Sequence, residues 1–423
     1  MNLKVNRSAT GHGGALTGHT MLCALRWRTF AGCLLLSLAL VACDAGLTPP
    51  VIATATNASI PVATQATQAF PVVPTSTPPA RQTPRPATAT PTVVTVAPSA
   101  TRAVTVTPAV TLTTAPPTSM HDSALRSRIC AGVAQGSFTD YPWGAALPGW
   151  YLDWHVHSQA DNIPGTEHAQ MVRLSGSSFY PDLNTLRAAA QASPGALWLI
   201  GNEPDVAWQD NIPPAIYATT YHTLYTALKA ADPRARIAIG AVSQVTPLRL
   251  RYLEKILEAY TAQFGAPMPV DVWNTHVFVL REERDSWGVG LPPGMEDATD
   301  GTLWNLEDHA RVDLVAEQVR TFRRWMAQHG QGAKPLIISE YGILMPADYG
   351  FEPPVVAAFM NGTFDYFARA RDQALGDPAD DYRLVQRWCW YSVADTTFPT
   401  GNLFDVESQQ PTTLWPTFAA YLR

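Results

Sequence analysis

Acidic residues are almost absent from the first part of this sequence. Of the 35 Asp and Glu in 423 residues, only Asp44 precedes position 122. From position 121 onward, 34 acidic residues face 22 Lys and Arg, so this part of the chain has a net charge of −12. Because such a charge repels a polyanion, we expect no nucleic-acid partner. The mean hydropathy of −0.04 excludes a protein that spans the membrane many times.

Cysteine is also scarce, and the usual cofactor motifs are missing. Three of the five Cys lie near the N-terminus, and the other two are Cys130 and Cys389. This spacing fits no zinc site, and the sequence contains no HExxH motif, no P-loop and no GxGxxG motif entering a helix. We therefore expect neither a metal nor an organic cofactor.

Residues 1–43 have the features of an export signal. Arg26 and Arg28 precede an apolar run from Phe30 to Cys43 that is too short to span a bilayer comfortably. The run ends in LVAC, which resembles a bacterial lipobox, where cleavage before Cys43 leaves its thiol to be lipidated. A plain signal peptide is the alternative, and Met21 is an alternative start. We expect an exported protein that is extracellular or held at the membrane by a lipid anchor alone.

Residues 44–122 have the composition of a linker. The stretch from Gly46 to Ser119 holds 14 of the 36 prolines, is rich in Thr and Ala, and contains no Asp, Glu or Lys. Such a segment has no amphipathic face with which to build a core, and its prolines fix many φ angles. We expect a disordered, extended Thr/Pro-rich tether.

Residues 123–423 alternate short apolar strands with amphipathic helices. Helical stripes at i, i+3, i+4 and i+7 occur around Tyr221, Leu253 and Val315, and Gly330 supplies a helix stop after the last of them. Eight strands are expected, at 129–133, 150–156, 170–174, 197–200, 237–242, 270–277, 336–339 and 386–392. This alternation is typical of α/β proteins with a parallel sheet, and eight strands favour a (β/α)8 TIM barrel. Cys130 and Cys389 would then lie on neighbouring strands, so a disulfide between them is possible.

Two carboxylates follow apolar strands. Glu203 follows the fourth expected strand, in "LWLIGNEP", and Glu340 follows the seventh, in "PLIISEYG". In a (β/α)8 barrel the carboxyl ends of the strands carry the chemistry, so both side chains would face the same mouth. The two motifs resemble the paired signature of the clan-A (4/7 superfamily) retaining glycoside hydrolases. The resemblance implies a retaining hydrolase of β-glycosidic bonds with Glu203 as acid/base and Glu340 as nucleophile.

The same resemblance suggests substrate-binding residues. It implies that Asn202 binds the 2-hydroxyl of the sugar and that a Trp on strand eight forms the floor of the sugar site. Tyr341 follows the nucleophile candidate and would contact it or the substrate. The full set of candidate substrate-binding residues is Asn202, His276, Asn274, Tyr341, Trp388, Trp390 and Arg173.

Alternatives remain open for several of these residues. His276 is as compatible with a satisfied core histidine, and one of the two Trp with a surface position. Many clan members carry an Arg near the end of strand two, where this chain has Asp153, His155 and His157, so Arg173 on strand three would take that role. The alternative function is a cell-surface carbohydrate-binding barrel without turnover. We expect a monomer that binds a polysaccharide or oligosaccharide.

Overall fold

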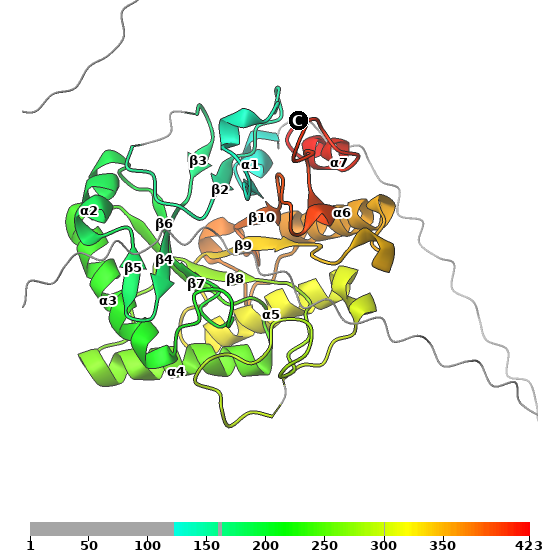
Figure 1. Ribbon diagram of the computed structural model, residues 1–423. Coiled ribbons are helices and arrows are strands. Elements are labelled where there is room, and N and C mark those ends of the chain that lie inside the picture. The colour runs from blue at the N-terminus through cyan, green and yellow to red at the C-terminus, as the bar shows by residue number, and fades with distance from the viewer. Residues whose placement is uncertain (1–121, 160–162, 300) are drawn as a thin grey trace, which may run out of the picture. The chain divides into compact units, whose positions relative to one another are not determined.

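The computed structural model describes residues 122–159, 163–299 and 301–423 (Figure 1). The expected signal, Cys43 and the tether therefore lie outside the described residues. The helices are α1 (Asp122–Arg126), α2 (Leu183–Ala192), α3 (Pro214–Ala231), α4 (Pro247–Phe264), α5 (Val312–Gln328), α6 (Pro353–Arg369) and α7 (Trp415–Ala420). The strands are β1 (Ile129–Gly132), β2 (Trp150–Leu152), β3 (Glu167–His168), β4 (Gln170–Ser175), β5 (Ser178–Tyr180), β6 (Leu197–Asn202), β7 (Arg236–Ala241), β8 (Trp273–His276), β9 (Leu336–Gly342) and β10 (Arg387–Tyr391).

The strands form two mainly parallel sheets. One sheet has the order β3-β2-β1-β10-β9-β8, and the other has the order β5-β4-β6-β7, with β5 antiparallel to β4. A single residue, Ala169, separates β3 from β4. Isolated parallel bridges from Ala238 to Val272 and from Val242 to Thr275 connect the edges of β7 and β8. All eight expected strands are present, but the ladder is interrupted at these two places and does not form one continuous closed ring.

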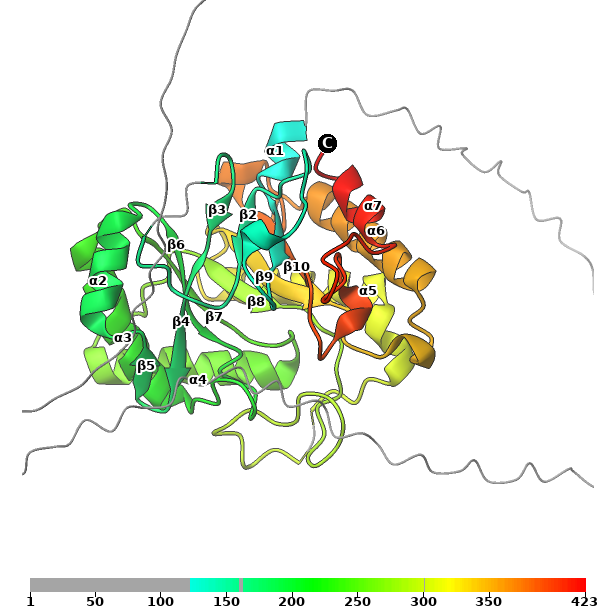
Figure 2. The same ribbon diagram turned by 45° about the horizontal axis from the view of Figure 1, so that its top comes forward.

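The core is divided into an inner cluster and two outer clusters. Alternate residues of the strands, such as Trp150, Leu152, Leu197 and Leu199, belong to one buried cluster between the strands. The residues between them, such as Tyr151, belong to the two clusters under the helices. This period of two is what β-strands impose when both of their faces are buried. Figures 1 and 2 show α3 and α4 side by side on one flank of the strands, with α6 and α7 on another.

Helix α4 begins and ends at residues with capping signals in the sequence. In α4, Pro247 occupies the first turn, the Thr246 side chain accepts a hydrogen bond from the Arg249 amide, and Gly265 ends the helix at φ 67°. Proline lacks an amide donor that the first turn would leave unpaired, and glycine tolerates a left-handed cap. The three expected helical stripes fall in α3, α4 and α5, and Gly330 lies two residues beyond α5.

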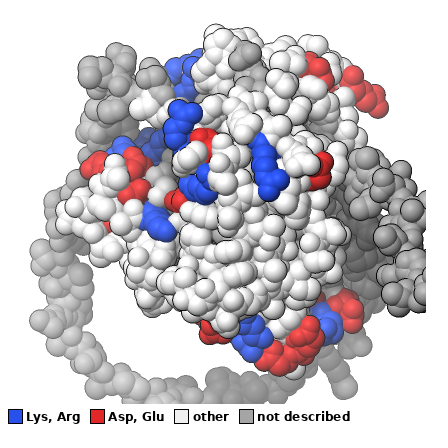
Figure 3. All heavy atoms as spheres, turned by 90° about the vertical axis from the view of Figure 1, so that its left-hand side faces the viewer, with Lys and Arg blue, Asp and Glu red and all other residues white. Residues whose placement is uncertain are grey.

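The regular strand-helix repeat begins only after β4. Between β1 and β2 the chain forms a short 3-10 turn, Phe138–Asp140, and the described residues between β2 and β3 contain no helix. The early part of the expected (β/α)8 pattern is therefore incomplete. No helix within the described ranges is both long enough and apolar enough to cross a membrane. On the face beside α2, basic and acidic side chains lie in mixed groups. A broad uncharged area separates these groups (Figure 3).

Candidate active site

The end of β6 explains why an apolar strand runs into a polar cluster. Gly201 has a φ of 91°, and a Cβ there would lie 3.1 Å from both Asp210 Oδ2 and Leu174 Cδ1. Only glycine adopts such a backbone readily, and the absent side chain lets the neighbouring groups approach. Two residues later, Glu203 is in the left-handed region at φ 43° and is 7% exposed. The local backbone therefore departs from regular strand geometry at the point where the first candidate carboxylate begins.

At the end of β9, an irregularity in strand pairing orients the Glu340 carboxylate. Thr275 of β8 lies opposite Ile338, whereas His276 lies opposite Glu340, so β9 has one extra residue, Ser339, at this point. Such a bulge shifts the alternation of side chains by one position. Ile337 faces the inner cluster and Ile338 an outer one, and regular alternation would place Glu340 on the outer face. Because of the bulge, both Ser339 and Glu340 face His276.

His276 lies between the two candidate carboxylates. Its Nδ1 is 3.0 Å from Glu203 Oε1, its Nε2 is 3.2 Å from Ser339 Oγ, and the same nitrogen is 3.9 Å from Glu340 Oε2. The imidazole is completely buried. Carboxylate oxygens of Glu203 and Glu340 and a ring nitrogen of His276 lie within 4.8 Å of one another. These three groups offer ligand atoms of the kind that bind metals, and both imidazole nitrogens lie within hydrogen-bond distance of side chains of the site.

Trp154, two residues beyond β2, supplies a hydrogen-bond donor to the nucleophile candidate. Its Nε1 donates to Glu340 Oε2 at 3.2 Å, and its ring packs edge-on against Tyr391 at 5.7 Å. A Cβ at position 132 would lie 3.0 Å from Cη2 of Trp154, so Gly132 leaves room for the indole. The nucleophile candidate is therefore held by a neutral N–H group and bordered by aromatic rings.

The surroundings of Glu340 and His276 shift the pKa of both groups. Burial raises the pKa of Glu340 to about 7, with the negative charge of Glu203 acting in the same direction and the His276 and Trp154 side chains opposing it. For His276 burial acts downward, but Glu340 and Glu203 outweigh it and raise the pKa above the usual value.

A buried ionic network lies behind Glu203. Arg249 of α4 donates its Nε to Asp205 Oδ2 at 2.6 Å and pairs through Nη1 with Glu282, and all three side chains are 0% exposed. Ser243 Oγ donates to the same Asp205 oxygen at 2.8 Å. Glu282 also accepts a hydrogen bond from the Thr302 amide at 2.6 Å, which joins two distant points of the long segment between β8 and α5. The turn after β6 is thus fixed to α4 and to this segment.

Asn202 and Arg173 lie beside the acid/base candidate in a separate network. Arg173 donates its Nε to Asp210 Oδ1 at 2.8 Å and contacts Gln209, so it binds neither candidate carboxylate. Its side chain therefore does not contact Glu340 as a replacement for the strand-two arginine would, although its charge still favours the ionised form of Glu340. Asn202 donates to Gln209 Oε1 at 3.4 Å, and its buried Oδ1 has no partner among the described residues. The side-chain oxygen and nitrogen of Asn274, buried on β8, have none either.

Three predicted substrate-binding aromatics point away from the carboxylates. Tyr341, Trp388 and Trp390 belong to the outer cluster beneath α6. The Tyr341 hydroxyl lies 3.1 Å from Thr363 Oγ1, and Trp390 donates its Nε1 to the Gly401 carbonyl. The two Trp do share one face of β10, as expected, but it is the outer face. Strand alternation explains this correction, because Cys389 and Tyr391 occupy the inner face.

Cys130 and Cys389 form a disulfide between paired positions of β1 and β10. Sequence reasoning allowed this bond, but it missed Trp154, Ser339 and the Asp205-Arg249-Glu282 network. Trp154 continues the spacing of Trp150 and Leu152 at every second position. This period of two was the available signal that its side chain lies on the inner side of the strand. The partners of Arg249 are 44 and 33 residues away, and no local pattern identifies them.

No family model and no curated protein matches this chain. Its fold is similar to a GH128 (subgroup I) endo-β-1,3-glucanase from Amycolatopsis mediterranei, at 17% identity over 70% of this chain and 99% of that one, with a TM-score of 0.46. A GH128 (subgroup II) endo-β-1,3-glucanase from Sorangium cellulosum matches at 14% identity over 70% of this chain and 98% of that one, with a TM-score of 0.47. A GH128 (subgroup III) curdlan-specific exo-β-1,3-glucanase from Blastomyces gilchristii matches at 15% identity over 70% of this chain and 99% of that one, with a TM-score of 0.46. At these values the likeness does not establish the function of this chain, which has to follow from its own residues.

Proposed function

We propose that this protein is a retaining glycoside hydrolase that cleaves β-glycosidic bonds of a polysaccharide or oligosaccharide. The observation that carries the proposal is the approach of Glu203 and Glu340 to within 4.8 Å at the ends of two parallel strands. Retaining glycosidases place their two carboxyl groups about 5–5.5 Å apart, whereas inverting enzymes need roughly 6.5–9.5 Å to admit a water molecule.

The mechanism follows from the positions of the two carboxyl groups. An ionised Glu340 oxygen attacks the anomeric carbon, while Glu203 donates its proton to the departing glycosidic oxygen. Water then attacks the glycosyl-enzyme, Glu203 accepts a proton from that water, and the Glu340 carboxylate is released. We infer that the unpartnered Asn202 Oδ1 accepts a hydrogen bond from a sugar hydroxyl.

His276 and Trp154 position this pair. The imidazole fixes Glu203 through Nδ1, and the indole N–H stabilises the ionised form of Glu340. With a Glu340 pKa raised to about 7, ionised nucleophile accumulates only as the pH rises through neutrality. We therefore expect the acidic limb of kcat/KM against pH to lie near 7, well above the usual range of a glutamate.

The proposal has further parts that concern the whole chain. We infer that the eight parallel strands act as a (β/α)8 barrel, with the two ladder interruptions bridged by Ala169 and by the isolated bridges at Ala238 and Val242. Export, lipidation at Cys43 and a monomeric state belong to the same proposal. The solved structures with a similar fold include β-1,3-glucanases, so a β-1,3-glucan belongs among the substrates to test.

The deciding experiment is hydrolysis by the full chain of aryl β-glycosides and of β-1,3-glucan, mixed-linkage β-glucan, xylan and galactan. Glu203→Gln and Glu340→Gln are compared with Glu258→Gln, which changes an exposed glutamate on α4. We expect turnover of at least one substrate, unchanged in the Glu258 variant. A general acid contributes about 10²- to 10⁴-fold, so each catalytic variant should lose at least that much on polysaccharide.

Two outcomes would overturn the proposal. Full activity in Glu340→Gln would show that this carboxylate is not the nucleophile. Sugar binding without turnover, unchanged in both catalytic variants, would instead establish the carbohydrate-binding barrel. The specific observation behind that alternative is the absence of an arginine contact to either carboxylate among the described residues.

A further inference from the structure

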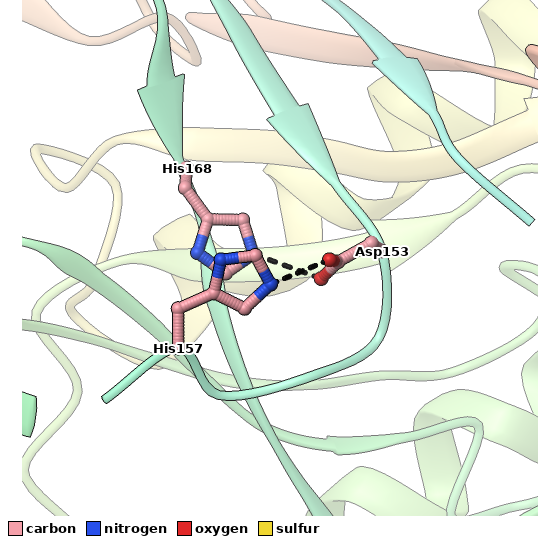
Figure 4. Close-up of side chains that lie close together, drawn as sticks. All are labelled: Asp153, His157 and His168. Carbon is pink, nitrogen blue, oxygen red and sulfur yellow. Dashed lines mark hydrogen bonds and ion pairs between the residues drawn. The ribbon is translucent and has the colours of Figure 1, made fainter. Parts of the chain in front are cut away.

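A second group of titratable side chains lies away from the two catalytic carboxylates. Asp153 follows β2, His157 lies in the segment after it, and His168 is on β3. Figure 4 shows both imidazoles directed at the Asp153 carboxylate. His157 Nε2 lies 2.7 Å from Oδ2, and His168 Nε2 lies 2.8 Å from Oδ1. We call these three residues the His-Asp-His cluster.

The cluster lies on the side of β2 and β3 that a helix would normally cover. His168 contacts Tyr151, a member of the outer core, at a ring distance of 4.8 Å. Trp154, next to Asp153, instead belongs to the inner core. Because no helix is found in the described part of the chain between β2 and β3, the cluster helps to fasten this segment to the strands. His157 is also held through its backbone N–H, which donates to Gln170 Oε1 at 2.8 Å.

The ligand atoms of the three side chains converge, as they would around a bound cation. The imidazole rings stack at 3.9 Å, and one ligand atom from each residue lies within 4.8 Å of the others. The side chains of His157, Asp153 and His168 are 30%, 16% and 4% exposed, so one side of the cluster is open to solvent. Two imidazole nitrogens and one carboxylate oxygen are the ligands of three-residue zinc sites, with a fourth position left for water.

The protonation of the cluster is compatible with metal binding. Burial opposes ionisation of Asp153, but the His157 and His168 hydrogen bonds outweigh it and hold the carboxyl pKa far below its usual range. Nδ1 of His168 has no partner among the described residues, so no donor fixes the lone pair on that nitrogen. The ring can therefore carry its proton on Nδ1 and present an unprotonated Nε2 to a cation.

We propose that Asp153, His157 and His168 form a binding site for a divalent transition-metal ion of the Zn²⁺ class. The ion replaces the two hydrogen-bonded protons of the cluster and joins β2, β3 and the segment between them. It takes no part in bond cleavage, because the adjacent Trp154, and not the cluster, contacts Glu340. Its effect on the catalytic centre is to hold the backbone next to Trp154.

The test is titration of the full chain with Zn²⁺ after chelator treatment, followed by calorimetry and thermal unfolding. We expect one ion per chain, a Kd in the micromolar range or below, and an increase in Tm of several degrees at saturation. Substituting Co²⁺ should give the visible absorption of a tetrahedral site. Binding is measured without substrate, so the result does not depend on the proposed hydrolase activity.

The variants separate the cluster from other histidines. His157→Ala and Asp153→Asn should weaken Zn²⁺ binding at least tenfold and abolish the increase in Tm. His155→Ala is the matched control, because within the described ranges its ring hydrogen-bonds to the Asp153 backbone carbonyl and not to the carboxylate, and it should bind as the parent does. Circular dichroism verifies that the variants fold, and Asp153→Asn preserves side-chain volume if His157→Ala unfolds. Absence of binding to the parent, or equal binding to both cluster variants, would overturn the proposal.

Discussion

The two candidate carboxylates lie in contrasting surroundings. Glu203 precedes a turn that is fixed by a buried ionic network, in which Asp205 and Glu282 share Arg249. Glu340 lies on a bulged strand beside Trp154 and Tyr391 and receives a hydrogen bond from a neutral indole. One carboxyl group is thus placed by ion pairs behind it, and the other by aromatic packing around it.

This contrast shows how one site can hold two glutamates with different tasks. Ion pairs with several partners fix the direction of a turn, whereas a buried aromatic surrounding destabilises the charged form of a carboxyl group. The surroundings of Glu340 therefore raise its pKa, and this nucleophile candidate is largely ionised only above neutral pH. The following variants test each side of the comparison.

The largest expected effect separates the two roles by stereochemistry. Glu203→Ala and Glu340→Ala should each lose about 10²- to 10⁴-fold or more in kcat/KM on a polysaccharide. Azide added to Glu203→Ala, with an aryl β-glycoside as substrate, should yield a β-glycosyl azide, because the covalent intermediate still forms on Glu340. Azide added to Glu340→Ala should attack directly and yield the α-azide. Product NMR checks this assignment, and the same anomer from both variants would contradict it.

The next effect concerns the stability of the Glu203 side. Arg249→Met leaves Asp205 and Glu282 buried without their cation, which should lower the free energy of unfolding by about 3–5 kcal/mol. Arg251→Met is the matched control on the same helix, because Arg251 and Asp297 form an exposed pair and such pairs contribute at most about 1 kcal/mol. Urea denaturation of the full chain measures both. A similar loss in the two variants would show that the buried network has no special role.

A smaller effect concerns the protonation of the Glu340 side. Trp154→Phe removes the N–H group that favours ionised Glu340, so the pKa of this carboxyl should rise further. A net hydrogen bond of about 0.5–1.5 kcal/mol corresponds to a shift of roughly 0.4–1 pH unit. The acidic limb of kcat/KM should move upward by that amount. Trp150→Phe, on β2, loses an indole hydrogen bond to the Arg128 carbonyl before β1 and should leave the limb in place. A limb unmoved in both variants would exclude the Trp154 contact.

The smallest effect tests the bulge on β9. Ser339→Ala removes the hydroxyl next to His276 Nε2 and should lower kcat/KM about two- to fivefold, which corresponds to less than about 1 kcal/mol. Tyr341→Phe removes a hydroxyl that contacts Thr363 on the outer side, so kcat/KM should stay within about twofold of the parent. Steady-state kinetics on the best substrate measures both. A larger loss in Tyr341→Phe would mean that Tyr341 faces the substrate after all.

The sequence alone predicted the framework better than the orientation of individual side chains. The eight strands and the helices α3, α4 and α5 follow from hydrophobic periodicity, a local property. Tyr341, Trp388 and Trp390 were assigned to the substrate because they neighbour site residues in sequence, but alternation places them on the outer face. The bulge at Ser339 arises from the pairing of β9 with both of its neighbours, and no single strand encodes it.

The His-Asp-His cluster was invisible to sequence reasoning for a related reason. Asp153 and His157 are four residues apart, but His168 joins them only because β3 pairs with β2. Spacing rules for metal ligands describe sites built within one loop or helix. A site assembled across strands becomes apparent only when the register is known.

The disulfide between Cys130 and Cys389 also determines how the protein carries mechanical load. It joins the first and last strands of the described fold, and the cysteines are 259 positions apart in sequence. A pull applied between the two ends of the chain therefore passes from β1 directly into β10 through a covalent bond. The strands that carry Glu203 and Glu340 lie inside the closed loop and remain free of tension for as long as that bond is intact.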